Sequence, residues 1–239
     1  MPRRLATAAL VALVPLTASA GSLTVFASGE DLATGGFVEP RLTRDGWALE
    51  FTGILATFDR ITAYRTDPPF MADGPGIAGP ALEIGGPFTV DLIAADSRDR
   101  VALATRDAPE GHFNALAWAL VPAADGPAAG QSLVFQGIAR RDGVEVPFTL
   151  TSADSVMHAC GEYLGDDRKG FVTAGSTAEL EITLHLDHLF GRADKPADDP
   201  MNLQAPGFAP FAAGGRHAIS LDGLHLGHVG EGHCHVTPL

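Results

Sequence analysis

The sequence predicts a single all-β domain, mainly antiparallel and β-sandwich-like, with long loops and at most short helices. Apolar and polar residues alternate in several short runs, and this period of two is typical of half-buried strands. The 28 glycines and 17 prolines lie mainly between these runs, where turns are expected. Many short strands joined by close turns favour an antiparallel sandwich or barrel.

Nine runs have this strand character. In chain order they are 22–27, 47–51, 55–64, 88–93, 115–121, 133–140, 144–151, 178–186 and 217–221. The second and third are expected to pair through a turn near Gly53. The sequence Arg141-Asp142-Gly143 predicts a hairpin turn between the sixth and seventh.

Helical signals are weak by comparison. The stretch 191–215 is rich in proline, alanine and glycine, and we expect a long connection with a short helix around 208–213. Long loops inside compact domains are often functional. Neither an internal repeat nor a dividing linker is evident, so residues 21–239 are expected to form one domain.

Residues 1–20 have the pattern of a cleavable signal peptide. Arg3 and Arg4 precede an apolar stretch over residues 5–16, and Ala18-Ser19-Ala20 supplies the small residues of a cleavage site. The apolar stretch is about 12 residues long, whereas a helix that spans a bilayer needs roughly 20. The sequence therefore predicts an exported protein, periplasmic or extracellular, without a membrane span after cleavage.

The chain is acidic, with a formal net charge of −13. Removal of the two arginines in the signal peptide makes this charge more negative. Such a chain repels nucleic-acid phosphates and anionic lipid heads. Nucleic acids and membrane surfaces are therefore excluded as expected partners, while the question of a protein partner stays open.

Two cysteines, Cys160 and Cys234, are present. In an oxidising compartment such a pair usually forms a disulfide, and two cysteines allow one intramolecular connectivity. A pair of thiolate metal ligands is the alternative. The bridge would fasten the C-terminal end of the chain to its middle.

The histidines are concentrated near the C-terminus, where seven of the nine fall between His185 and His235. Imidazole is the commonest protein ligand for zinc and copper. Period-two geometry sends His185 and Asp187 to one face, and His188 joins them if the strand ends or bulges there. Further along, residues 225–235 interleave four histidines and a glutamate with glycines that allow tight turns.

These two clusters predict a transition-metal site for zinc or copper. The expected ligands are His185, His188, His225, His228 and His233. The expected outer or additional ligands are His158, Asp187, Glu231 and His235. The predicted disulfide would carry His158 towards His233 and His235, because bonded cysteines have α-carbons about 5 to 6 Å apart.

Other interpretations remain open. The histidines could belong to a polar loop without a metal, in a structural or interaction domain. Oxygen ligands for calcium could come from Asp166, Asp167, Asp194, Asp198 and Asp199, although their spacing is not that of an EF-hand. A metal-dependent hydrolase or oxidase could use the same histidines. No zinc-protease motif, nucleophile elbow or phosphate loop occurs in the sequence, which favours binding, storage or delivery of the metal over catalysis.

Four segments together resemble a group of uncharacterised exported bacterial β-rich proteins. They are Gly29-Glu30-Asp31, Asp45-Gly46-Trp47, His185-Leu186-Asp187-His188-Leu189-Phe190 and Gly227-His228-Val229-Gly230-Glu231-Gly232-His233-Cys234. The resemblance covers most of the chain after the signal peptide. It implies an exported β-rich domain and assigns no catalytic residue.

Overall fold

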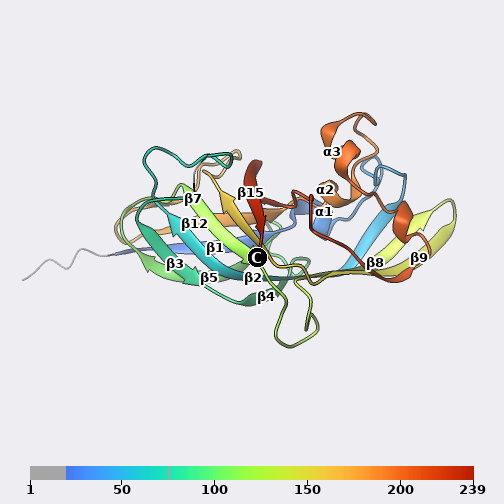
Figure 1. Cartoon of the computed structure of the whole chain (residues 1–239), viewed down its shortest axis with the longest axis horizontal. Coiled ribbons are helices and arrows are strands. Elements are labelled where there is room, and N and C mark those ends of the chain that lie inside the picture. The colour runs from blue at the N-terminus through green and yellow to red at the C-terminus, as the bar shows by residue number, and fades with distance from the viewer. Residues whose placement is uncertain (1–19, 75) are drawn as a thin grey trace, which may run out of the picture.

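The computed structural model describes residues 20–74 and 76–239 (Figure 1). The predicted signal peptide lies outside the described residues apart from Ala20, and it stays a prediction. Within the described part, nearly all buried apolar side chains belong to one continuous core. This single core and the predominance of strands over short helices confirm an all-β single domain.

Fifteen strands are present in the described residues. They are β1 (Gly21–Ser28), β2 (Ala48–Tyr64), β3 (Ala81–Gly85), β4 (Phe88–Asp91), β5 (Arg100–Ala108), β6 (Gly111–His112), β7 (Ala115–Leu120), β8 (Leu133–Arg141), β9 (Val144–Ser152), β10 (Val156–Cys160), β11 (Phe171–Val172), β12 (Thr177–Leu184), β13 (Gly215–Ala218), β14 (Gly227–Val229) and β15 (Gly232–Pro238).

The helices are short, as predicted. They are α1 (Glu30–Thr34), α2 (Asp187–Phe190), α3 (Pro200–Gln204) and a 3₁₀ turn, η1 (Ala209–Phe211). The last of these lies inside the range 208–213, where the sequence predicts a short helix. Among the described residues, no helix is long and apolar enough to cross a membrane.

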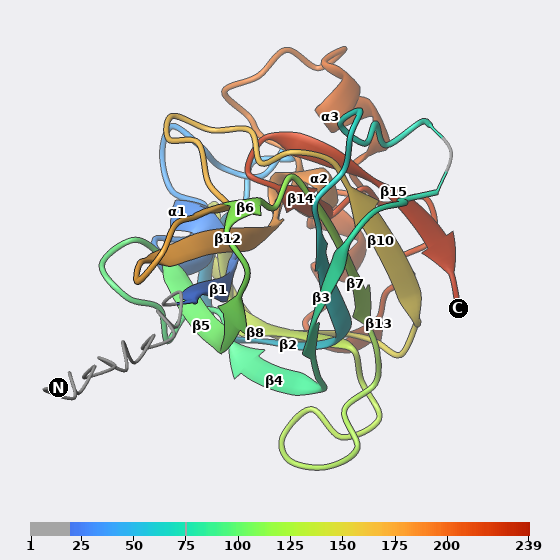
Figure 2. The ribbon, with the colours of Figure 1, turned by 90° about the vertical axis from the view of Figure 1, so that its left-hand side faces the viewer.

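Thirteen of the strands form one curled sheet. Its order is β13-β9-β8-β2-β7-β10-β15-β14-β12-β1-β5, with β3 and β4 also paired to β2. Most pairings are antiparallel, but β1 with β12 and β9 with β13 are parallel. The sheet curls until β5, at one edge, contacts β3 and β4, so that the strands surround the core (Figure 2). The main sheet is therefore one curled sheet, mainly antiparallel as predicted but mixed.

The prediction of two strands joined by a turn near Gly53 is wrong, because β2 runs through this glycine as one strand of 17 residues. Its first half pairs with β8 and its second half with β7, and the register against β8 shifts between Phe51 and Gly53. The glycine therefore marks a bulge. The long strand connects the two ends of the molecule.

The predicted hairpin after β8 is confirmed. Arg141 pairs with Val144, and the intervening Asp142 and Gly143 have φ angles of 51° and 77°. Positive φ at both central residues is the signature of a type I′ turn.

The predicted disulfide between Cys160 and Cys234 is present. The two cysteines lie directly opposite each other in the antiparallel pair β10–β15. The bridge therefore fixes the C-terminal strand, and with it the histidine-rich hairpin β14–β15, to the middle of the sheet.

Candidate metal centre

The histidines of the two sequence clusters meet where β12 ends. After Leu184 the chain leaves the sheet, and the backbone of His188 donates a hydrogen bond to the carbonyl of His185 (3.1 Å), so that α2 begins. The hairpin β14–β15 places His228 directly opposite His233. Because β14 also pairs with β12, residues about forty positions apart in the sequence become neighbours.

His228 is at the centre of the resulting cluster. Its ring centroid lies 4.0 Å from that of His185, 4.9 Å from that of His188 and 4.6 Å from that of His233. One donor atom from each of His185, His188 and His228 lies within 4.8 Å of the other two. His185 and His228 are buried and His188 is half-buried, while His233 is exposed at the rim.

The tautomer of His228 is fixed by its own chain. Its Nε2 lies 2.8 Å from the carbonyl oxygen of His225. A carbonyl can only accept, so Nε2 carries the proton and donates. In the neutral ring the lone pair is then on Nδ1, which is buried and has no hydrogen-bond partner among the described residues. A buried acceptor without a partner costs about 1–3 kcal/mol, and a bound ion would satisfy it.

The electrostatics keep this part of the cluster neutral. Burial, followed by the neighbouring His185 and His188, lowers the pKa of His228 to about 2. Burial also lowers the pKa of His188 to about 4, with smaller contributions from the neighbouring histidines. Both rings are therefore uncharged at neutral pH, which is the form that binds metal ions.

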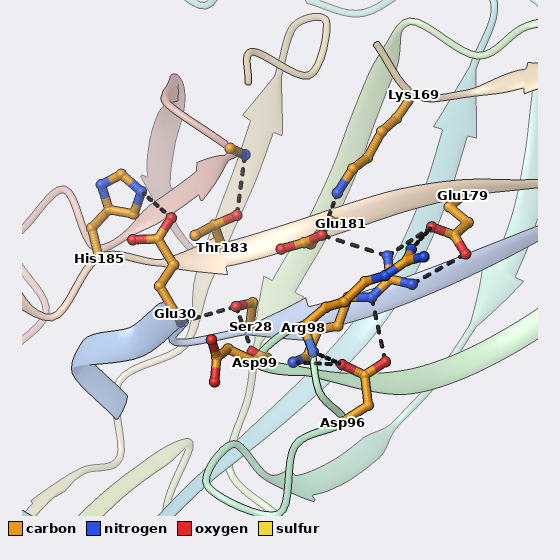
Figure 3. A network of polar contacts seen from close by, with 12 residues as sticks. Ser28, Glu30, Asp96, Arg98, Asp99, Lys169, Glu179, Glu181, Thr183 and His185 are labelled. Carbon is orange, nitrogen blue, oxygen red and sulfur yellow. Dashed lines mark hydrogen bonds and ion pairs between the residues drawn. The ribbon is translucent and has the colours of Figure 1, made fainter. Parts of the chain in front are cut away.

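His185 differs because it faces carboxylates. Burial alone would lower its pKa, but Glu30, Asp187 and Glu231 together outweigh this effect and raise it. Nε2 of His185 lies 3.5 Å from Oε1 of Glu30, and Figure 3 shows the carboxylate directed at the ring. At this distance the contact is an ion pair, and Nε2 of His185 makes no hydrogen bond among the described residues.

The ring orientations limit which histidines can share one ion. The rings of His185 and His228 are almost parallel, with 9° between their planes. Because lone pairs lie in the ring plane, one of these rings has to rotate about its Cβ–Cγ bond before both can bind the same ion. The ring of His228 is inclined by 52° to that of His188 and by 50° to that of His233. Of these two, His188 belongs with His228 to a group of converging donor atoms in the described residues, and His233 does not.

Among the other predicted ligands, His225 is exposed. It takes part in the cluster through its carbonyl, which orients His228. Asp187 is buried at the start of α2, and burial raises its pKa. Glu231, in the turn between β14 and β15, has a carboxylate oxygen within 4.8 Å of donor atoms of His185 and Glu30.

His158 does not join this cluster. Side chains alternate along strands, and His158 shares the buried face of β10 with Cys160, where it stacks on Trp118 at 3.7 Å. His233 and His235 occupy the exposed face of β15, opposite to Cys234. The disulfide therefore brings the strands together while leaving His158 on the other side of the sheet.

A pocket of about 570 Å³ lies beside the cluster. Its lining includes His188, His225, His233, His235 and Met201. The half-buried His188 thus lines this pocket, while the buried His185 and His228 do not.

Glu30 lies beside the cluster, in a group of donor atoms with His185 and Glu231, and is not among the predicted ligands. Its backbone has a φ of 55°, which is rare for residues other than glycine. The sequence contains no signal for this conformation, and no spacing links residue 30 to residue 185.

Two of the five aspartates considered for calcium make other interactions. Asp194 forms an ion pair with Arg192, and Asp199 caps α3 by accepting from the backbone of Met201. Neither belongs to a group of converging donor atoms in the described part of the chain.

Comparisons of the chain with family models, with curated proteins and with solved structures found no match. Its function therefore has to be argued from the chemistry of the histidine cluster.

Proposed function

We propose that the protein binds a transition-metal ion, zinc or copper, at the cluster of His185, His188 and His228, with His233 as a further ligand at the rim. The role is binding, storage or delivery of the ion. Imidazole nitrogen suits both metals.

The observation that carries this proposal is the lone pair of His228 Nδ1. It is buried, unprotonated and without a hydrogen-bond partner in the described part of the chain, and its ring is held in place by the carbonyl of His225. Metal-bound histidines usually donate their other ring N–H to an outer acceptor in this way. If this side chain served only to fill the core, an apolar residue would do so without the free-energy cost of burying an unpaired polar nitrogen.

We also propose that the protein works outside the cytoplasm. A disulfide between the two cysteines of the chain, both buried, is typical of proteins that fold in an oxidising compartment. The predicted signal peptide agrees with export, and the disulfide supports it independently.

The test is metal content after equilibrium dialysis against Zn²⁺, with His228→Ala compared with His217→Ala. His217 is the matched control, because its Nε2 contacts the carbonyl of Gly214, three residues earlier, at 2.9 Å, just as His228 contacts that of His225. We expect bound zinc in the wild type and in His217→Ala, and a loss of at least one ion per chain in His228→Ala. Equal zinc content in all three proteins would contradict the proposal.

The pocket beside His188 and His233 favours a second candidate, a metal-dependent hydrolase or oxidase. An ion that keeps a coordination position open towards this pocket could bind water or substrate there. The assays are turnover of an activated ester and, in the copper-loaded protein, oxidation of a phenol by added dioxygen, which takes up the electrons and is reduced to peroxide or water. Either activity would have to require the metal and to disappear in His228→Ala. Activity that survives the removal of metal would exclude this candidate.

A further inference from the structure

A second set of donor atoms lies on the other side of His185. It consists of Glu30, His185 and Glu231, whose donor atoms lie within 4.8 Å of one another. Glu30 begins α1, His185 follows β12, and Glu231 lies in the turn between β14 and β15. Only His185 belongs to both this set and the set with His188 and His228.

The two carboxylates differ from the other acidic residues nearby. Along the same face of β12, Glu179 binds Arg100. Glu181, on the same face, binds Lys169, as Figure 3 shows. Glu30 forms an ion pair with His185 alone among the described residues, and Glu231 forms none there. Arginine and lysine partners are thus present at one end of this polar row, whereas at the other end His185 is the one ion-pair partner among the described residues.

His185 directs an unsatisfied atom at these carboxylates. Its side chain is 8% exposed, and its buried Nε2 makes no hydrogen bond in the described structure. This atom is an independent indication of a ligand, because buried polar groups are almost always paired.

The backbone of Glu30 is held in a costly conformation that orients its side chain. A residue with a Cβ at φ 55° costs about 1–2 kcal/mol. Its N–H is fixed by Oγ of Ser28 at 2.9 Å, and that hydroxyl in turn donates to the carbonyl of Asp99 at 2.8 Å. Conformational strain that the surroundings maintain in this way is concentrated at functional sites.

One neutral imidazole has one lone pair, so His185 can serve one ion at a time. When His185 turns to the carboxylates, His188, His228 and His233 remain for the first ion, and their rings are mutually inclined by 50° to 79°. In this arrangement His185 and His228, whose rings are nearly parallel, do not have to bind the same ion.

We propose that Glu30, His185 and Glu231 form a second cation position, so that the loaded protein holds two divalent ions side by side. One nitrogen and two carboxylates suit zinc and harder divalent cations. The two-ion state rests on the proposed function, since the first of its two ions is the one bound at His228, whereas the second position uses donor atoms of its own.

The test measures zinc per chain after equilibrium dialysis. We expect two ions in the wild type and one in the double variant Glu30→Gln and Glu231→Gln. His228→Ala is expected to keep the ion at the carboxylate position.

Glu162→Gln is the control, because Glu162 lies 3.6 Å from His112 in a separate carboxylate–histidine pair. This variant should still bind two ions. Glu30 and Glu231 are not buried, so their replacement by glutamine should not prevent folding, which circular dichroism checks.

The outcomes separate the two proposals. Equal zinc in the wild type and in the double glutamine variant overturns the second position, and a simultaneous loss in His228→Ala leaves the first position intact. Loss of zinc in the glutamine variant, with no loss in His228→Ala, contradicts the first position and with it the two-ion state. Absence of bound zinc in the wild type overturns both.

Discussion

His228 contacts three other imidazoles, and its value as a ligand depends on an atom that no sequence pattern identifies. The density of histidines between residues 185 and 235 predicts a cluster. Which rings are buried, and which nitrogen keeps its lone pair, depends on the pairing of β12 with β14 and on the carbonyl of His225. Glu30 and His158 show the same limit of sequence-based prediction. Glu30 is near the cluster because it contacts His185, and His158 is away from it because it lies on the buried face of β10.

At Glu30, backbone strain can be separated from loss of the carboxylate. We expect metal-free Glu30→Gly to be more stable than metal-free Glu30→Ala by about 1 kcal/mol, because alanine keeps the penalty of positive φ and glycine does not. Urea unfolding of the two variants measures this difference. Both should bind zinc more weakly than the wild type. An alanine variant as stable as the glycine variant would show that the conformation is not strained.

At His158, pH dependence tests burial. Burial lowers the pKa of His158 to about 3, against about 6.5 in the unfolded chain. Below pH 6.5 the unfolded state therefore binds more protons than the folded state, and the free energy of unfolding falls as the pH drops. This residue contributes at most about 1.4 kcal/mol per pH unit to that fall.

The variant His158→Phe can still stack on Trp118 and removes an Nδ1 that has no partner. Between pH 7 and pH 5, its unfolding free energy should fall by about 2 kcal/mol less than that of the wild type. The contributions of His188 and His228 are common to both proteins. Identical pH profiles would contradict the assignment of a low pKa to His158.

At the scale of elements, alternation in sequence predicts strands that have a polar and an apolar face. It identifies β1, β7, β8 and β9 well. It misses β10, which is short, and β15, which is rich in histidine. These two segments form strands because they pair with each other, and β10 also pairs with β7. Gly53 appears as a turn signal but occupies a bulge, since both halves of β2 have partners.

The hairpin β14–β15 depends on Gly230, which has a φ of 59°. A Cβ at this position would lie 1.9 Å from the carbonyl oxygen of Leu164, whereas a Cβ at Gly223, with a φ of 74°, would meet nothing within 4 Å. Both alanine variants incur the cost of positive φ. We expect Gly230→Ala to be less stable than Gly223→Ala by a further 1–3 kcal/mol or so, and to bind zinc more weakly. Thermal unfolding and zinc titration measure this, and equal stability would show that the turn is not closely packed.

At the scale of the whole molecule, the disulfide connects β10 to the C-terminal strand across 74 residues of sequence. A loop of this length predicts a stabilisation of about 4 kcal/mol through the unfolded state. The double variant Cys160→Ala and Cys234→Ala should lose about this much unfolding free energy. A reductant should destabilise the wild type and leave the variant unchanged. Equal stability of the two proteins under oxidising conditions would contradict this role.

The cluster itself is tested most directly by a crystal structure of the protein grown with Zn²⁺, with anomalous scattering recorded at the zinc edge. We predict an anomalous peak about 2.0–2.1 Å from Nδ1 of His228, while Nε2 keeps its hydrogen bond to His225. Zinc found only at exposed histidines such as His233 and His235, with Nδ1 of His228 unbound, would contradict a metal centre at this position.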